Sequence, residues 1–195
     1  IEFKSIINQY DINQIRAVAT SAVRNAINGS EFIMKAQMVS GIDIEIISGD
    51  EEAALIYEGV KLSGAIEGKS LIMDIGGGST EFIFCDENKS YWKKSFDIGA
   101  ARLMQKFWKN DPITKEEQEQ INNHLVSTLK DLVEFNKSFG AKNLIGSAGA
   151  FETFMAMTQS NHNIEQEDIT SARLNMDSYN HLSRELMLST HQQRS

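Results

Sequence analysis

The chain has 195 residues, of which 41% are hydrophobic, enough for one ordinary domain or two small lobes with a packed core. Its formal net charge of −8 argues against an extended nucleic acid as partner, because such binding needs a basic face. No apolar run reaches the roughly 18 residues of a membrane helix, and the first residues lack the pattern of an export signal, so we expect no membrane partner and a cytoplasmic protein.

The first third of the chain alternates between short apolar runs and helical periodicity. We expect strands at residues 15–20 and 42–47, and helices at 21–27, 31–39 and 48–63. Ser21 is expected to cap the first helix and Gly41 to end the second, while Ser48 and Glu51 have capping-box spacing and Gly64 closes the third helix. The order strand, helix, strand predicts that the two strands pair in parallel.

The pattern changes near Ser70 to a β-hairpin, where we expect a second unit to begin. We expect strands at residues 71–75, 81–85, 91–96 and 143–145, helices at 100–108, 114–138, 150–158 and 178–188, and a polar loop at 159–168. Thr114 and Glu117 form another capping box, Gly140 ends that long helix, and Asp177 is expected to cap the last one.

The segment DIGGGSTE, residues 74–81, joins two of these apolar strands. Its glycines allow positive φ and let N–H groups converge on an anion. Asp74 at the strand end can hold Mg²⁺ through water, and Ser79 and Thr80 supply hydroxyls. A dinucleotide fingerprint needs a later glycine and an immediate helix, and a Walker A loop needs Gly-Lys, so neither fits. An ordinary glycine-rich hairpin turn with solvated polar residues remains the alternative.

Four charged residues are further candidates. Glu51 and Glu52 lie in the first turn of a helix, where acidic residues also simply complement the helix dipole. Glu51 has the capping position, which leaves Glu52 freer for chemistry. Arg24 follows a strand and a serine, so its guanidinium can reach the strand ends where ligands collect in α/β sheets. For Arg24 and Arg102 alike, the alternative is a plain surface residue.

A second small-residue turn, GSAG at residues 146–149, lies between a strand and a helix. Such a turn offers backbone N–H groups at a helix N-terminus, so Gly146, Ser147 and Gly149 are candidate phosphate-binding residues. The alternative to phosphate binding is that the turn serves only to pack the strand against the helix.

The single cysteine and the four histidines indicate no metal or thiol chemistry. Cys85 lies in an apolar strand-like run, which predicts a buried thiol and agrees with a reducing cytoplasm. The histidine spacings match no zinc pattern, and we expect no transition-metal site at His124, His162, His181 or His191.

Five motifs, taken in order, resemble the exopolyphosphatase and guanosine pentaphosphate phosphatase (Ppx/GppA) family. They are ATSAVRNA, IEIISGDEEAALIYEGV, LIMDIGGGSTEFIF, SFDIGAARL and LIGSAGAFETF, and they span about residues 15–158. The pairing of SGxEEA with DIGGGSTE is highly specific. The resemblance implies an α/β fold of the actin-like ATPase type, with two ribonuclease-H-like lobes and phosphate bound between them. Residues 1–66 would then be the C-terminal part of the first lobe and residues 67–195 most of the second.

The resemblance also implies roles for matching residues. Glu52 looks like the catalytic glutamate that orients and deprotonates the attacking water, Arg24 would bind the anionic chain, and Asp74 and Glu81 would hold Mg²⁺ or its waters. Phosphate would be cradled by Gly76, Gly77, Gly78, Ser79 and Thr80. The implied reaction is Mg²⁺-assisted in-line attack of water on the terminal phosphorus of polyphosphate or guanosine pentaphosphate. The backbone N–H groups of the turn, Arg24 and Mg²⁺ would supply the local positive field that a polyanionic substrate needs in an acidic protein.

The chain departs from the family pattern in two respects. Ala150 stands where the family usually has a threonine after the second turn, so a hydroxyl contact is expected to be missing. The family's opening strand with an Asp-x-Gly-Ser loop would lie upstream of Ile1, and its closing helices beyond Ser195. We therefore expect an internal fragment that is poorly active alone.

Two other functions compete with the phosphohydrolase. A sugar or acetate kinase of the same superfamily would bind adenine nucleotide tightly, but the SGDEEA helix argues against it. The second competing function is a catalytically silent module that senses polyphosphate or guanosine nucleotides. The choice between the two substrates stays open, as does the oligomeric state, although the superfamily often dimerises and a homodimer is one expectation.

Overall fold

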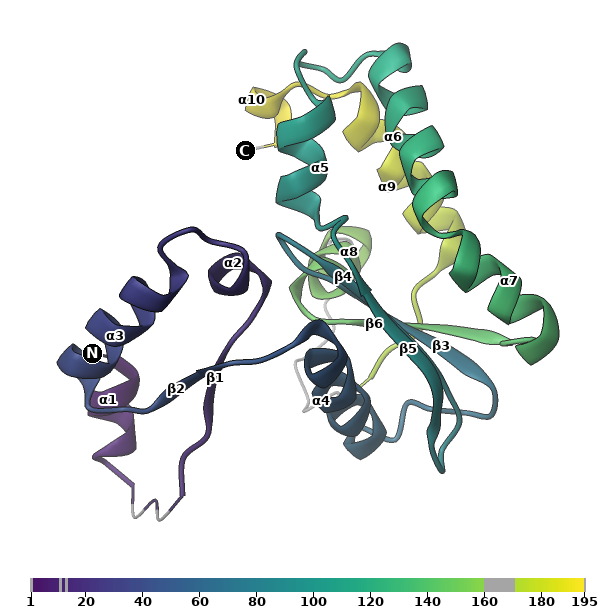
Figure 1. The fold of residues 1–195 in the computed structure, drawn as a ribbon. Coiled ribbons are helices and arrows are strands. Elements are labelled where there is room, and N and C mark those ends of the chain that lie inside the picture. Colours follow the sequence, from purple (N-terminus) through teal and green to yellow (C-terminus); the bar gives the residue numbers. More distant parts are fainter. Residues whose placement is uncertain (1, 11, 13, 160–170, 195) are drawn as a thin grey trace. The chain divides into compact units, whose positions relative to one another are not determined.

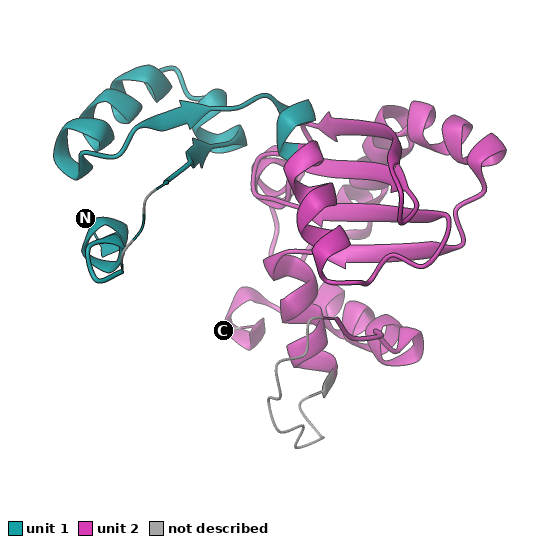
Figure 2. Cartoon of the chain, turned by 90° about the horizontal axis from the view of Figure 1, so that it is seen from below, with its two compact units in different colours: residues 1–52 teal, residues 53–195 magenta. Residues whose placement is uncertain are grey.

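The structure is a computed structural model that describes residues 2–10, 12, 14–159 and 171–194 (Figure 1). The polar loop predicted at 159–168 lies outside these residues except for its first. The chain divides into two compact units, Ile1–Glu52 and Ala53–Ser195 (Figure 2). The lobe boundary that the resemblance places near residue 67 stays a prediction.

The first unit contains the predicted parallel strand pair. Its elements are α1 (Glu2–Ile7), β1 (Ala17–Ala19), α2 (Ser21–Arg24), α3 (Gly29–Ser40), β2 (Ile44–Ile46) and the start of α4 (Gly49–Leu62). β1 and β2 pair in parallel, as predicted, over three residues each. Gly41 ends α3 with φ 65°, also as predicted. The prediction that Ser21 caps α2 is wrong, because Thr20 holds the N-cap position and Ser21 is buried within the helix.

The second unit is built on a four-stranded mixed sheet. Its strands are β3 (Ser70–Ile75), β4 (Thr80–Cys85), β5 (Ser90–Phe96) and β6 (Asn143–Ser147), in the order β5-β4-β3-β6. β3, β4 and β5 are antiparallel neighbours, whereas β6 runs parallel to β3. The predicted hairpin and third strand are therefore confirmed.

Both faces of this sheet are covered, which explains why every residue of β4 is buried. On one face, Ile72, Ile83 and Cys85 pack against Ala53 and Tyr57 of α4. The other face carries an aromatic cluster, defined as Phe84, Trp92, Phe135 and Phe139, in which Phe84 lies 5.1–5.6 Å from the other three ring centres. The sheet thus forms the central layer of the unit, with α4 and α7 on opposite sides (Figure 1).

Cys85 is a buried thiol, as predicted. It is fully buried in the face covered by α4. Burial, and then the nearby charges of Asp86 and Glu87, raises the pKa of the thiol to about 11. Cys85 is therefore a neutral core residue at physiological pH.

The helices of the second unit follow the predicted order with two corrections. They are α5 (Ala100–Phe107), α6 (Lys115–Thr128), α7 (Lys130–Phe139), α8 (Gly149–Gln159), α9 (Met176–Leu188) and α10 (His191–Arg194). The single helix predicted at 114–138 is broken at Leu129, whose ψ of 15° is not helical. The cap of α9 is Asn175, which accepts from the N–H of Ser178 at 2.9 Å, and not Asp177. None of the described helices is both long and apolar enough to cross a membrane.

Candidate active site

The triple-glycine turn joins β3 to β4 and is held on one side by the start of α5. The N–H groups of Gly99, Ala100 and Arg102 donate to the carbonyls of Gly78, Gly76 and Gly77, at 3.3, 2.9 and 3.1 Å. The Nε of Arg102 adds a bond of 2.8 Å to the Gly78 carbonyl. Residues 99–102 therefore engage all three glycine carbonyls.

The N–H groups of the same turn remain available to a ligand. Gly76 donates to the carbonyl of Ser79 at 3.0 Å, which closes the turn. Within the described part of the chain, no group accepts a hydrogen bond from the N–H of Gly77, Gly78 or Ser79. Consecutive N–H groups without internal acceptors can form a concave anion-binding site. The turn thus has the donors expected of a phosphate cradle.

Close packing explains the glycine at position 99, which lies against the turn. None of the three glycines of the turn adopts the positive φ that the sequence allowed for. Among the described residues, positive φ occurs in other glycines, namely Gly41, Gly64, Gly68 and Gly140. A Cβ on Gly99 would lie 2.5 Å from the carbonyl carbon and oxygen of Gly77. Only a residue without a side chain lets the start of α5 approach the turn this closely.

The two carboxylates predicted to hold Mg²⁺ lie opposite each other on neighbouring strands. Asp74 and Glu81 are direct partners in the β3–β4 ladder, and such partners leave the same face with Cβ atoms roughly 4.5–5.5 Å apart. Two carboxylates suit Mg²⁺, which usually takes one or two and keeps several waters. Among the described residues, no three His, Cys, Asp or Glu side chains are grouped to hold a metal ion. Mg²⁺ at this pair would therefore keep several water ligands.

Ser95, which sequence reasoning did not single out, joins this carboxylate pair. It is the partner of Glu81 on β5, and its hydroxyl donates to Oε1 of Glu81 at 2.6 Å. Glu81 is only 1% exposed, and a carboxylate buried to this degree requires hydrogen-bond donors. The sequence signal for Ser95 was its place in the motif SFDIGAARL.

The two hydroxyl residues predicted to touch phosphate are both buried, at 2% exposure. Thr80 donates its hydroxyl proton to the carbonyl of Ile98 at 3.3 Å, while its oxygen keeps the capacity to accept. Ser79 contributes its backbone carbonyl to the closure of the turn. Phosphate contacts from these two side chains stay predictions.

The second small-residue turn lies beside the first. β3 and β6 are parallel neighbours, and Asp74 pairs with Ser147 near their carboxyl ends. Ligands of open α/β sheets bind at this edge. The structure therefore brings together the two turns that the sequence predicted separately.

The geometry of the second turn explains one of its glycines. Ala148 joins β6 to α8 with φ 66°, an unusual value for a residue other than glycine. A Cβ on Gly146 would lie 2.1 Å from the ring of Phe151, whereas a Cβ on Gly149 would meet nothing within 4 Å. Gly146 is thus required for packing, and Gly149 leaves the start of α8 open.

The first unit brings together Arg24 and Glu52. Nη1 of Arg24 lies 3.1 Å from Oε2 of Glu52 and donates to the carbonyl of Ile47 at 2.8 Å. The two side chains are 22% and 16% exposed, so water screens this ion pair less than a surface pair. The arginine predicted to bind the anionic chain therefore also holds the predicted catalytic carboxylate.

Glu51 takes the structural role that the sequence predicted. Its N–H donates to the hydroxyl of Ser48 at 3.2 Å, which caps α4. Its side chain contacts Arg16, which also pairs with Glu45. The capping box is thus half formed, because the carboxylate of Glu51 is turned toward Arg16.

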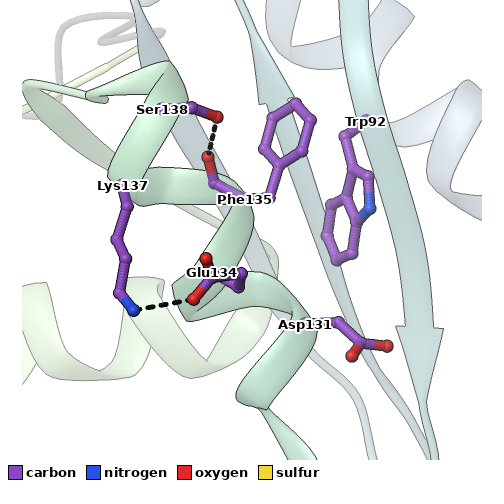
Figure 3. A pocket seen from close by; sticks show the side chains of 6 residues that line it. All are labelled: Trp92, Asp131, Glu134, Phe135, Lys137 and Ser138. Carbon is purple, nitrogen blue, oxygen red and sulfur yellow. Dashed lines mark hydrogen bonds and ion pairs between the residues drawn. The ribbon is translucent and has the colours of Figure 1, made fainter.

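Two hollows lie in the second unit. An open groove of about 1370 Å³ follows β6, and residues 146–148 of the second turn line part of it. A smaller hollow of about 460 Å³ lies between β5 and α7, where Trp92 and Phe135 face each other beside polar side chains (Figure 3). None of the residues around the smaller hollow was predicted to act in a site, so we place the candidate site at the edge of the sheet where β3 and β6 end.

Comparison with known proteins decides the family. The Ppx/GppA phosphatase family profile matches residues 1–194. The chain belongs to this family. It is 30% identical to a guanosine-5'-triphosphate,3'-diphosphate pyrophosphatase of Vibrio vulnificus over 97% of its own length. It also matches the crystal structure of an exopolyphosphatase from Cytophaga hutchinsonii with 35% identity and a TM-score of 0.94 over 99% of its length. A Ppx/GppA family member from Aquifex aeolicus matches with 26% identity and a TM-score of 0.80 over the whole chain.

These matches confirm the predicted α/β fold class, since the chain has the fold of Ppx/GppA proteins, which the resemblance assigned to the actin-like type. The chain spans only part of each relative. It covers 37% of the Vibrio protein, 63% of the Cytophaga structure and 62% of the Aquifex structure. The similarity therefore concerns one part of these longer proteins.

Proposed function

We propose that this chain carries part of the active site of a phosphohydrolase that releases orthophosphate from the end of inorganic polyphosphate, guanosine pentaphosphate, or both. The observation that carries this proposal is the triple-glycine turn, whose carbonyls are engaged by residues 99–102 while the N–H groups of residues 77–79 lack acceptors among the described residues. Family membership and the names of the relatives support the substrate class.

In this proposal the turn binds the terminal phosphoryl group. Its N–H groups are fixed dipoles, so they can stabilise the charge on the phosphoryl oxygens without reorganising during the reaction. The second turn beside it, with Gly146, Ser147 and Gly149, is assigned to the same anion. Such local donors overcome the repulsion that a net charge of −8 exerts on a polyanion.

We assign the general base to Glu52. Glu52 pairs with Arg24 at 3.1 Å, which fixes the direction of its carboxylate, and a carboxylate is a suitable general base for water. Arg24 holds this carboxylate and is also assigned to the anionic chain. The water then attacks the terminal phosphorus in line with the departing oxygen, and the shortened chain leaves as the phosphate product.

Asp74 and Glu81 are assigned to Mg²⁺ or its coordinated waters. Their all-oxygen donor set fits this ion, and Ser95 fixes the orientation of the Glu81 carboxylate by donating to Oε1. When bound, Mg²⁺ would neutralise charge on the phosphate oxygens. The cytoplasmic location and the homodimer remain expectations within this proposal.

The test measures phosphate release from polyphosphate and from guanosine pentaphosphate with Mg²⁺, using the full-length protein. Glu52→Gln removes the base but keeps the shape of the side chain, so we expect kcat to fall by about 10²–10⁴-fold on both substrates. Glu51→Gln is the matched control, because Glu51 is the neighbouring residue and pairs with Arg16. It should leave turnover within about twofold of wild type.

The thermal midpoints of both variants are compared with that of wild type. Equal values would show that both variants remain folded. Intact turnover in the folded Glu52→Gln protein would remove Glu52 from the mechanism. No phosphate release by the wild-type full-length protein from either substrate would refute the proposed function itself.

A further inference from the structure

In the triple-glycine turn, the carbonyl groups accept hydrogen bonds from residues 99–102, whereas the N–H groups of residues 77–79 have no acceptor among the described residues. Four hydrogen bonds from residues 99–102 reach the three glycine carbonyls, at 2.8–3.3 Å. Three of the donors are backbone N–H groups, and the fourth is the Nε of Arg102. Arg102 is the residue that contributes a side chain as well as a backbone donor to this contact.

Peptide geometry connects these carbonyls to the N–H groups of the turn. A carbonyl and the following N–H belong to one rigid plane and point in opposite directions in a trans peptide. The carbonyl of Gly76 therefore determines the direction of the N–H of Gly77. In the same way, the carbonyls of residues 77 and 78 determine the N–H directions of residues 78 and 79. These three N–H groups are the ones without an acceptor among the described residues.

We propose that Arg102 is a positioning residue that orients the phosphate-binding N–H groups of residues 78 and 79 by holding the carbonyls of Gly77 and Gly78 on the opposite side of the turn. This inference rests on the proposed function, since it assumes that the turn binds phosphate. Arg102 acts through the peptide planes of the turn. It thereby fixes the cradle before the ligand arrives, which lowers the cost of binding.

The chemistry of arginine suits this role. Its Nε bonds the carbonyl of Gly78 at 2.8 Å, while Nη2 lies 3.2 Å from Oδ1 of Asp97. The planar guanidinium makes both contacts in fixed directions, and lysine cannot reproduce this pair of contacts with a single ammonium group. The close approach of Gly99 to the turn keeps the carbonyls within reach of these donors.

A competing explanation is that Arg102 attracts phosphate directly by its charge, since its side chain is 40% exposed. The two explanations differ in what lysine does at this position. Lysine keeps the charge, so it should preserve a direct attraction, but it loses the directional bond to Gly78.

The test titrates inorganic orthophosphate into the ¹⁵N-labelled full-length protein and follows the amide signals of residues 77–79. We expect wild type to bind with shifts in these signals, and both Arg102→Ala and Arg102→Lys to raise the Kd about 10–100-fold. KM for polyphosphate should rise in parallel. Lys106→Ala, an exposed cation on the same helix, is the control and should match wild type.

Gly99→Ala gives an independent second variant, because its methyl group would displace the turn while the arginine stays in place. It should weaken phosphate binding to a similar degree and lower the thermal midpoint, because the methyl group meets backbone atoms at 2.5 Å. If Arg102→Lys binds phosphate as wild type does, the positioning role is refuted and the proposed function survives. If wild type shows no phosphate-dependent shift at residues 77–79, the turn is not the phosphate site and both proposals fail.

Discussion

Glu117 organises the start of α6 and the loop before it. Its carboxylate accepts from the N–H of Lys109 at 2.7 Å, from the N–H of Asn110 at 3.1 Å, and from the N–H and hydroxyl of Thr114 at 2.8 and 3.0 Å. These bonds, first among them the one from the Thr114 backbone, lower the pKa of Glu117 to about 2. The capping box predicted from the sequence is therefore part of a larger set of donors.

This pKa predicts a specific acid response. The pKa of a glutamate carboxyl is ordinarily 4.5 and that of Glu117 in the folded protein is about 2, so the contribution of this group to stability is complete above about pH 4.5 and is lost as the pH falls through 2. Glu117→Gln should therefore lose less of its free energy of unfolding than wild type between about pH 5 and pH 3. Urea unfolding at each pH measures this difference.

Glu116→Gln is the control for this experiment, because Glu116 lies in the same first turn but is exposed. It should follow the pH dependence of wild type. An equal pH dependence of wild type and Glu117→Gln would show that the Glu117 carboxylate is not held by these donors.

At the residue scale, the sequence predicted which groups belong to the site but not how they are held. The motif identified Asp74, Glu81 and the glycine turn as chemistry-bearing. The bond from Ser95 to Glu81 depends on the register between β4 and β5, and the bond from Arg102 to Gly78 depends on the docking of α5. The motif SFDIGAARL contains both Ser95 and Arg102, but their bonding partners cannot be read from local periodicity. For the same reason, the sequence did not predict that Gly99 is needed for close approach to the turn, or that the three turn glycines keep negative φ.

At the element scale, the type and order of the elements followed from periodicity, and the errors fall at boundaries. No glycine or proline marks the break at Leu129, and helical periodicity continues through it. Leu125, Leu129 and Leu132 all pack against the same sheet face, so tertiary packing accounts for the break better than local propensity. The cap of α9 was misplaced because Asn175 and Asp177 are both good N-cap residues and only the backbone conformation decides between them.

The aromatic cluster leads to a stability prediction for β4. Phe84 is fully buried and contacts the rings of Trp92, Phe135 and Phe139. Phe84→Ala would leave a cavity between the sheet and α7, so we expect a loss of about 3–5 kcal/mol in the free energy of unfolding. Chemical denaturation followed by tryptophan fluorescence measures it.

Phe3→Ala is the matched control, since Phe3 is 79% exposed on α1. It should change the free energy of unfolding by no more than about 0.5 kcal/mol. A loss below about 1 kcal/mol for Phe84→Ala would mean that the cluster is not the packed core of this sheet face.

At the scale of the whole molecule, net charge argued against an extended nucleic acid as partner and the lack of a long apolar run argued against a membrane helix. The family resemblance predicted the fold. Contacts divide the chain after Glu52 because Ala53 and Tyr57 pack on the sheet of the second unit. The two predicted parts of the catalytic machinery therefore fall in different units: Arg24 and Glu52 in the first, and both turns with their carboxylates in the second. No periodicity argument predicts such a division, since it depends on which long-range contacts form.

The central claim is that water attacks the terminal phosphorus of a phosphate chain, and isotope transfer tests it most directly. The full-length protein is incubated with polyphosphate and Mg²⁺ in ¹⁸O-labelled water under single-turnover conditions, and the products are analysed by mass spectrometry. We predict one ¹⁸O atom in each released orthophosphate and none in the shortened chain. Unlabelled orthophosphate together with ¹⁸O at the new chain end would place the attack on the neighbouring phosphorus and contradict this mechanism.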